Sequence, residues 1–441
     1  MNINNIENFF YAKSIAVVGA SDREGSVGEI LIRNIAEDFK GEIYPINPKR
    51  DEIKGLKAYK SISALPKAVD TVAICIPGKF IPAVIEECGQ KGIKSAVIIT
   101  DGLDMDIISE DGKNAFDAAK EMADKYGVRI AGPNCIGILA PNNNMNASFA
   151  NIKALPGKIA LVSESGAVAC SVPDYATSVN VGFSHIFSLG EQMDLDFPTV
   201  VEYLENDDSC ESMVLYMKKI HNKEKFLEVA KRVSKKKPIV LIKTASEEVD
   251  GVTTEDLENA GVVRIKSVND IYTSLIMLNA NVFPCKERVA VLTNSSGFSS
   301  ISVQMFKDFG ITLNDISKET KAKLDAILPP TWSQTNPVDI VGDATGERYA
   351  KTLEVLSEDP EIDTILTLYC PTNTYASEVA EEFSKVCKKS NKNVVCAFVG
   401  GQEVLKGRHI FYKNNIPVFR TPEGAVHVII NMSKLHGRYS K

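Results

Sequence analysis

Three turns rich in glycine and serine contain residues that could bind phosphate groups. The first, Gly19-Ala20-Ser21, follows an apolar run and is followed by Gly25 and Gly28. Glycines let the backbone approach a ligand closely, and the dipole of a following helix favours a phosphate at its N-terminus. The spacing is not G-x-G-x-x-G, so it does not indicate a nicotinamide site. This turn could hold a nucleotide-like ligand or could simply connect a strand to a helix.

The two other turns have the composition of anion sites. Asn134 follows a strand-like run, and Ser163, Ser165 and Gly166 lie between another such run and a predicted helix. Hydroxyls and free N–H groups at the start of a helix can bind phosphate or a carboxylate. Either turn could instead be an ordinary helix cap. Because the two turns are close together in the chain, we favour a true anion site.

Strands that alternate with helices would position these turns. Four short runs are apolar on both faces and have helical patterns between them: Ser14–Val18, Glu42–Ile46, Thr71–Ile76 and Ala96–Ile99. This pattern is typical of a parallel sheet covered by helices on both sides, in a doubly wound α/β domain. The alternation starts again twice further along the chain. The sequence therefore predicts three α/β domains, which are residues 1–131, 132–283 and 284–441.

Composition excludes several classes of function. The 441 residues include 50 Lys and Arg against 57 Asp and Glu, whereas a nucleic-acid-binding protein normally carries a basic surplus. No apolar run approaches the ~20 residues that span a bilayer, and the first residues do not resemble a signal peptide. The nine cysteines occur singly, without C-x-x-C, which argues against a zinc ribbon or a disulfide framework. We therefore expect a cytoplasmic protein with no nucleic-acid or membrane partner and no metal.

Several segments carry a specific resemblance when they are taken as a set. They are residues 14–21, 43–49, 130–137, 163–167, 288–294, 336–345 and 416–423. Together they resemble the α subunit of the NDP-forming acyl-CoA synthetases, relatives of succinyl-CoA synthetase that include the ADP-forming acetyl-CoA (acetate–CoA) ligases. The resemblance spans nearly the whole chain in order. It implies a CoA-binding Rossmann-like domain followed by two flavodoxin-like ligase domains.

The resemblance also implies a ligand-binding role for particular residues. Those that would bind coenzyme A are Gly19, Ala20, Ser21, Lys49, Pro77 and Thr100. Those that would border the acyl and phosphate site are Asn134, Ser163, Ser165 and Gly166, with Asn294 and Gly297 from the third domain. Family members convert acyl-CoA and phosphate to acyl phosphate, then pass the phosphoryl group to a histidine and on to ADP, which an ATP-grasp β subunit holds. The sequence shows no glycine-rich ATP-grasp region, so a partner chain would supply it, and we expect an oligomer.

The loop that carries the phosphorylated histidine in the family is replaced here. After Lys243 the family pattern has a Gly/Ala/Ser-rich loop that ends in a Ser-His-Thr-Gly-like sequence, whereas residues 245–256 are acidic and contain no histidine. In addition, Lys218 stands where the family has the glutamate that orients the histidine. An imidazole at this site would lack its carboxylate partner. The two departures together predict that the phosphohistidine step has been abandoned.

Two residues near this loop are the remaining candidates for catalysis. Among the five histidines, His221 alone could replace the carrier, because it follows Ile220 in the segment that normally supports the phosphohistidine. The structural or surface histidines are His185, His409, His427 and His436. Lys218 could attract a phosphate or an acyl phosphate, or it could be an exposed lysine without a role.

Three functions remain open on these grounds. The first is a CoA-dependent acyltransferase that retains only the half-reaction between acyl-CoA and an anion such as phosphate. That chemistry needs a CoA site and oriented N–H groups that stabilise the tetrahedral oxyanion, but no histidine carrier. The second is a non-catalytic CoA- or acyl-CoA-binding subunit that regulates or scaffolds a partner. The third is a complete ADP-forming ligase with a relocated carrier, which the shortened loop disfavours.

Overall fold

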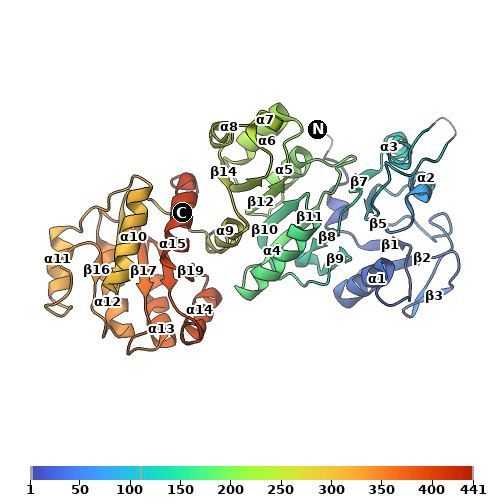
Figure 1. Ribbon diagram of the computed structural model, residues 1–441. Coiled ribbons are helices and arrows are strands. Elements are labelled where there is room, and N and C mark those ends of the chain that lie inside the picture. Colours follow the sequence, from blue (N-terminus) through green and yellow to red (C-terminus); the bar gives the residue numbers. More distant parts are fainter. Residues whose placement is uncertain (1–2, 110–111, 440–441) are drawn as a thin grey trace. The chain divides into compact units, whose positions relative to one another are not determined.

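The computed structural model describes residues 3–109 and 112–439, which form two compact units (Figure 1). Unit 1 comprises Met1–Thr177 and Gly182–Arg264, and unit 2 comprises Ser178–Val181 and Ile265–Lys441. Unit 1 contains two large sheets and a two-stranded ribbon, and unit 2 contains a third large sheet. The predicted α/β fold class is confirmed.

The first sheet of unit 1 is parallel, with strand order β2-β1-β5-β6-β7. Its strands are β1 (Ser14–Val18), β2 (Glu42–Ile46), β5 (Thr71–Ile74), β6 (Ser95–Ile98) and β7 (Arg129–Ala131). The connecting helices are α1 (Val27–Asp38), α2 (Ile81–Lys91) and α3 (Ala115–Tyr126), and the ribbon pairs β3 (Glu52–Ile53) with β4 (Leu56–Lys57). The chain reverses its direction of winding between β1 and β5. In such sheets, ligands bind beyond the carboxyl ends of the strands at this reversal.

The second sheet has the order β14-β13-β12-β10-β11-β8-β9. Its strands are β8 (Gly137–Ala140), β9 (Met145–Ser148), β10 (Pro156–Ser163), β11 (Phe183–Ser188), β12 (Ser212–Met217), β13 (Ile239–Lys243) and β14 (Val262–Ile265). The central strands β13, β12, β10 and β11 are parallel, as the sequence predicted. The hairpin of β8 and β9 pairs antiparallel at one edge, and the sequence pattern did not predict it. The helices of this sheet are α4 (Gly166–Ser178), α5 (Phe197–Glu205), α6 (Lys223–Val233), α7 (Glu247–Asp250) and α8 (Thr254–Asn259).

Unit 2 contains a parallel sheet with the order β16-β15-β17-β18-β19. Its strands are β15 (Val289–Thr293), β16 (Val338–Asp339), β17 (Thr364–Tyr369), β18 (Asn393–Phe398) and β19 (Val418–Phe419). Its helices are α9 (Val268–Ala280), α10 (Ser296–Asp308), α11 (Lys318–Asp325), α12 (Gly346–Glu358), α13 (Ala376–Cys387), α14 (Gln402–Lys413) and α15 (Pro422–Met432). Helix α9 belongs to this unit, although the sequence analysis assigned it to the second domain; the three domain boundaries themselves remain predictions.

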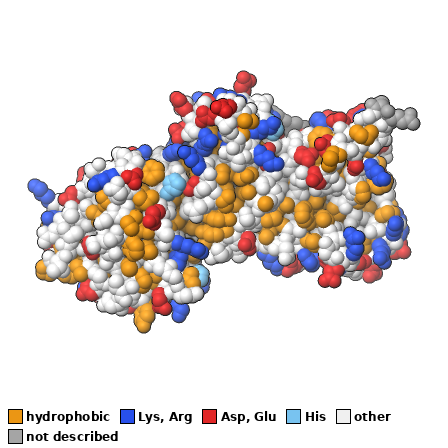
Figure 2. All heavy atoms as spheres, viewed as in Figure 1, with side chains coloured by type: hydrophobic (Ala, Val, Ile, Leu, Met, Phe, Trp, Pro, Cys, Tyr) orange, Lys and Arg blue, Asp and Glu red, His pale blue; other side chains and the backbone are white. Residues whose placement is uncertain are grey.

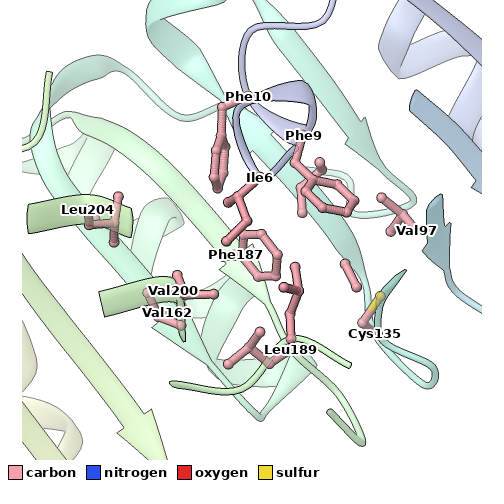
Figure 3. Close-up of a cluster of buried hydrophobic side chains, with 14 of the residues drawn as sticks. Ile6, Phe9, Phe10, Val97, Cys135, Val162, Phe187, Leu189, Val200 and Leu204 are labelled. Carbon is pink, nitrogen blue, oxygen red and sulfur yellow. The ribbon is translucent and has the colours of Figure 1, made fainter. Parts of the chain in front are cut away.

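One hydrophobic core joins the two sheets of unit 1. Phe9, in the short helix η1 (Glu7–Phe9), packs edge-on against Phe187 of β11 with ring centroids 5.9 Å apart (Figure 3). Val97 of the first sheet and Val162 of the second belong to the same cluster of buried side chains. Burying one such side chain contributes about 1.5–3 kcal/mol, so a shared core fixes the edge of one sheet against the other.

On the face shown in Figure 2, charged side chains of both signs are mixed. Figure 2 shows Lys and Arg interspersed with Asp and Glu over the face in view, as the near-balanced composition predicts. Among the residues that the structure describes, no helix has both the length and the apolar character needed to cross a membrane.

Candidate functional site

The predicted ligand-binding turns of unit 1 meet at the carboxyl edge of the first sheet. Gly19 follows β1, Pro77 comes shortly after β5, Thr100 after β6 and Asn134 after β7. A cleft of about 780 Å³ lies beside this edge and is also bordered by the second sheet. The predicted residues that line the cleft are Pro77, Thr100, Asn134, Ser165, Gly166 and Lys218. The fold therefore brings the predicted CoA path and the predicted anion turns into one cavity.

Gly19 is required by the packing of its own turn. Its φ of +95° is rarely adopted by L side chains, and a Cβ atom here would lie 2.6 Å from the carbonyl oxygen of Cys75. A Cβ on Gly28, at the start of α1, would lie 2.0 Å from the Gly19 carbonyl oxygen. The two glycines therefore let the start of α1 come directly against the turn, which places free N–H groups of the helix beside it.

Gly19 and the other residues of this predicted phosphate site lie at the same sheet edge, but none of them is part of the lining of the cleft. The Ser21 hydroxyl accepts a hydrogen bond from the Arg23 amide at 3.0 Å, and Ala20 is buried. Lys49 follows β2, and its backbone amide donates to Asn47 at 2.8 Å while its side chain is exposed. Their contact with CoA remains a prediction.

Thr100 and Asn134 are held by hydrogen bonds between successive strand ends. The Thr100 hydroxyl donates to the Ile76 carbonyl at 2.7 Å, and the Asn134 amide donates to the Thr100 carbonyl at 2.9 Å. Asn134 has a φ of 55°, a conformation that asparagine tolerates better than most residues. Its side-chain amide donates to Glu191 at 3.1 Å, so this exposed side chain is oriented along the cleft wall.

The turn after β10 presents the N-terminus of α4 to the cleft. Ser165 and Gly166 line the cavity, as predicted, whereas Ser163 is fully buried and absent from the lining. The Ser163 hydroxyl accepts from the Ser165 amide at 3.0 Å and donates to the Ser165 carbonyl at 2.9 Å. This buried hydroxyl therefore shapes the turn and does not face the cleft.

Glu164 is a cleft residue that the sequence analysis did not identify. Its side chain is only 5% exposed, yet it borders the cavity. One carboxylate oxygen accepts a hydrogen bond from Gln192 at 2.6 Å, and the other accepts from the backbone amide of Lys218. His221 Nε2 lies 3.8 Å from the first oxygen. An acidic residue between two serines is typical of an exposed turn, so the sequence gave no reason to expect that Glu164 is buried.

Lys218 and His221 both lie just beyond the end of β12, with exposed side chains. Lys218 lines the cleft, and no ion pair of its ammonium group is found within residues 3–109 and 112–439. His221 is 58% exposed and does not line the cleft. The structure thus places Lys218 where it can meet an anion and sets His221 to one side, near Glu164.

The segment predicted to replace the family's histidine loop is folded and is held against the second sheet by hydrogen bonds and an ion pair. Lys243 Nζ lies 2.6 Å from Asp250 Oδ1 and donates to the Val252 carbonyl at 3.1 Å. Asp250 also accepts from the backbone amides of Ile220 and Val252, both at 3.1 Å. The segment forms α7, and α8 begins with a capping box between Thr253 and Asp256.

Three thiols form part of the cleft wall. They belong to Cys75, Cys135 and Cys170. Burial raises the pKa of Cys75 and of Cys135 to about 12 and also raises the pKa of Cys170. Together with Phe149, Ile136 and other apolar residues of the lining, these uncharged thiols give the cavity an apolar wall.

The two predicted residues of the third domain lie in unit 2. Asn294 is 4% exposed, and its side chain donates to the Cys370 carbonyl at 2.9 Å and accepts from the Cys370 amide at 3.0 Å. It therefore ties the end of β15 to the end of β17. Gly297 lies in the first turn of α10. Their approach to the acyl site remains a prediction.

The remaining histidines have the structural or surface positions that were expected. His185 is buried in β11, and its Nε2 lies 3.3 Å from Asp207. His427 is half-exposed on α15, 3.4 Å from Asp270. His409 and His436 are exposed.

Three family models match successive parts of the chain. They are a CoA-binding domain over residues 13–141, a succinyl-CoA ligase-like flavodoxin domain over 156–277 and a ligase-CoA domain over 289–435. The α subunit of ADP-forming acetate–CoA ligase II of Pyrococcus furiosus is 32% identical over 97% of this chain and 98% of its own length. The chain therefore belongs to the α-subunit family of the ADP-forming acyl-CoA synthetases.

Solved structures of this family have the same fold. The acetyl-coenzyme A synthetase 1 of Candidatus Korarchaeum cryptofilum matches at a TM-score of 0.90 with 31% identity, covering 98% of this chain and 97% of that one. The same enzyme has also been solved in complex with phosphate and ADP, and that structure matches at a TM-score of 0.89.

The α-subunit family also includes longer proteins. This chain spans 64% of the 34%-identical ADP-forming acetate–CoA ligase I of Archaeoglobus fulgidus and 62% of the 37%-identical ligase of Methanocaldococcus jannaschii.

Proposed function

We propose that this α-subunit family member binds CoA thioesters in the unit 1 cleft and transfers the acyl group to a small anion such as phosphate, without a phosphohistidine. The observation that carries the proposal is the continuity of the cleft. Pro77 and Thr100, from the predicted CoA path, line the same cavity as Asn134, Ser165 and Gly166. A thioester carbonyl can therefore lie between a CoA site and an anion site.

The start of α4 supplies the electrostatic part of the proposed reaction. A phosphate oxygen attacks the thioester carbonyl, and the tetrahedral oxyanion is stabilised by free N–H groups of the first turn of α4. The C–S bond then breaks, the CoA thiolate leaves and takes up a proton, and acyl phosphate is the other product. Lys218, at the cleft wall, attracts the anion. None of these steps needs a histidine carrier.

A non-catalytic CoA-binding subunit is the second candidate, and Glu164 is the observation in its favour. Its buried carboxylate borders the anion end of the cleft, where a negative charge opposes the binding of phosphate. In addition, the Ser163 hydroxyl is occupied within its own turn. A protein that only holds CoA or acyl-CoA for a partner tolerates both features.

Both candidate functions involve a partner chain. The relatives that match this chain along almost their whole length are named as α subunits. The resemblance implies that a separate ATP-grasp β-like subunit would bind to this chain. A chain without a phosphoryl carrier, however, would have no phosphoryl group to pass to the ADP that this subunit holds. We therefore propose a heteromeric assembly in which this subunit contributes the CoA site.

Acyl phosphate formation is the test that separates the two candidates. The full chain is incubated with acetyl-CoA or longer acyl-CoA thioesters and phosphate, alone and with any co-purifying chain, and the products are analysed by mass spectrometry. Acyl phosphate is expected. If none appears while calorimetry shows binding of CoA, the protein is the non-catalytic subunit. If CoA does not bind, both proposals fail.

A second experiment tests the absence of a phosphorylated enzyme. The protein is incubated with acetyl-CoA and labelled phosphate, or with labelled ATP and a β subunit. It should remain unlabelled. An acid-labile, base-stable label that maps to His221 would instead support a complete ligase with a relocated carrier.

A further inference from the structure

Unit 2 brings together a thiol, a carboxylate and an imidazole that are far apart in the sequence. Cys285 precedes β15, Asp363 directly precedes β17, and His436 follows the short helix η4 (Ser433–Leu435) at the C-terminal end of the chain. The Cys285 sulfur, an oxygen of Asp363 and a ring nitrogen of His436 all lie within 4.8 Å of one another. We propose that these three side chains bind a thiolate-preferring divalent metal ion such as zinc.

The donor set matches the chemistry of this ion. Zinc is bound by cysteine sulfur, histidine nitrogen and carboxylate oxygen, and bond lengths of about 2.0–2.3 Å place neighbouring ligand atoms roughly 3.3–3.8 Å apart. The three atoms need to approach by only about 1 Å to meet that spacing. A water molecule would complete the coordination, or Glu287 after a movement of its side chain, since its Oε2 lies 3.3 Å from the Cys285 sulfur. Harder ions such as magnesium and calcium prefer oxygen ligands alone.

Neighbouring groups already orient the ligands. The Thr364 hydroxyl donates to the Cys285 carbonyl at 2.8 Å, and Cys285 is 8% exposed. His436 Nδ1 lies 2.9 Å from the Phe283 carbonyl oxygen. When Nδ1 carries the proton, it donates to this oxygen and leaves Nε2 with the lone pair that a metal needs. Metal-ligating histidines are typically held by such an outer hydrogen bond.

Asp363 also pairs with Arg288, so it can bind a metal ion only with the oxygen that the arginine leaves free. Its Oδ2 lies 3.2 Å from Arg288 Nε. A carboxylate has two oxygens, so the arginine can keep one while the other faces the ion. The thiol proton of Cys285 passes to the solvent as the metal binds. Because Cys285 precedes β15 and His436 lies near the C-terminal end of unit 2, the bound ion would tie the C-terminal segment to the start of the sheet and raise the stability of the unit.

Cobalt substitution of the full chain tests the site. After treatment with a chelator, we expect one Co²⁺ per chain, a near-ultraviolet sulfur-to-cobalt band, and displacement by Zn²⁺. Cys285→Ser should abolish the band, and His436→Gln should weaken binding at least tenfold. As matched controls in the same unit, Cys370→Ser and His409→Gln should bind cobalt as the unaltered protein does.

Stability provides a second measurement. Zn²⁺ should raise the melting temperature of the unaltered protein but not that of Cys285→Ser or His436→Gln. His436 is exposed, so its replacement should fold, and circular dichroism verifies this for each variant. Less than stoichiometric cobalt, a band that survives in Cys285→Ser, or equal zinc stabilisation of every variant would each overturn the proposal.

Discussion

Lys243 and Asp250 form a salt bridge in the interior of unit 1, with their charged atoms 2.6 Å apart and their side chains 0% and 1% exposed. The pair joins the end of β13 to the end of α7. It therefore fixes the segment that we predict to stand in place of the family's histidine loop. Together with the hydrogen bonds that Asp250 accepts from Ile220 and Val252, the pair holds this segment against the second sheet.

Asp250→Asn should destabilise unit 1 by about 3–5 kcal/mol, because it leaves the buried Lys243 ammonium without its counterion. Urea unfolding measures the loss, and limited proteolysis should show new cleavage between residues 244 and 253. As a control, Lys323→Ala removes exposed ion pairs to Glu319 and Glu358 and should cost less than ~1 kcal/mol. Equal losses in the two variants would contradict the structural role of the buried pair.

Asp207 should make the protein sensitive to acid. Burial alone would raise the pKa of this carboxyl, but hydrogen bonds from His185 and Ser209 and the charge of His185 outweigh it and hold the pKa well below its usual value. A carboxyl whose pKa is lowered by folding stabilises the protein above its unfolded pKa of about 3.9, and this contribution is lost as the pH falls further.

Asp207→Asn should therefore lower the free energy of unfolding by roughly 1–3 kcal/mol at pH 7, and by progressively less as the pH falls below about 4. Urea titrations across this pH range measure the difference. Its exposed neighbour provides the control, since Asp208→Asn should leave the pH profile unchanged. A difference for Asp207→Asn that does not shrink in acid would contradict the prediction.

Gly19→Ala should lower the free energy of unfolding by about 2–4 kcal/mol. The alanine would have to keep a φ of +95°, which strains its backbone, and its Cβ atom would clash with the Cys75 carbonyl oxygen. It should also weaken CoA binding at least tenfold, which is about 1.4 kcal/mol. Gly25→Ala is the matched control, since Gly25 has a φ of +73° but no atom within 4 Å of its Cβ position. That change should cost only about 1 kcal/mol. Calorimetry that finds equal CoA affinity in both variants would remove CoA from this turn.

Lys218→Ala should weaken the use of phosphate by up to about fivefold and leave CoA affinity unchanged, because an exposed cation contributes about 1 kcal/mol or less to binding an anion. Steady-state assays with varied phosphate measure the effect. Lys219→Ala is the adjacent control, because Lys219 is exposed and does not line the cleft. Without turnover, phosphate should protect Lys218 from acylating reagents. Similar behaviour of the two lysines would favour the non-catalytic subunit.

The sequence predicted those strands that are buried on both faces. Ser14–Val18 has the predicted bounds, because an unbroken β-branched and apolar run has few alternatives to a central parallel strand. The hairpin of β8 and β9 was missed. Its four-residue strands include Gly137 and Asn146, and so they lack a distinct apolar alternation.

The sequence predicted those site residues that lie in turns just after strands. Thr100, Asn134 and Ser165 lie two or three residues beyond the ends of β6, β7 and β10, and parallel strands bring such positions to one edge. Glu164 was missed because its burial depends on Gln192 and on the amide of Lys218, which are distant in sequence. The Cys285 cluster gave no signal either, since its members share no short spacing that a motif could contain.

The apolar wall of the cleft has a redox consequence. A thiol with a pKa of about 12, such as that of Cys75 or Cys135, is ionised at neutral pH in roughly one molecule in 10⁵. Disulfide exchange requires the thiolate, so these thiols are almost inert toward a disulfide that enters the cavity. A ligand that carries its own thiol can therefore lie beside Cys75 and Cys135 with little tendency to form a mixed disulfide with them.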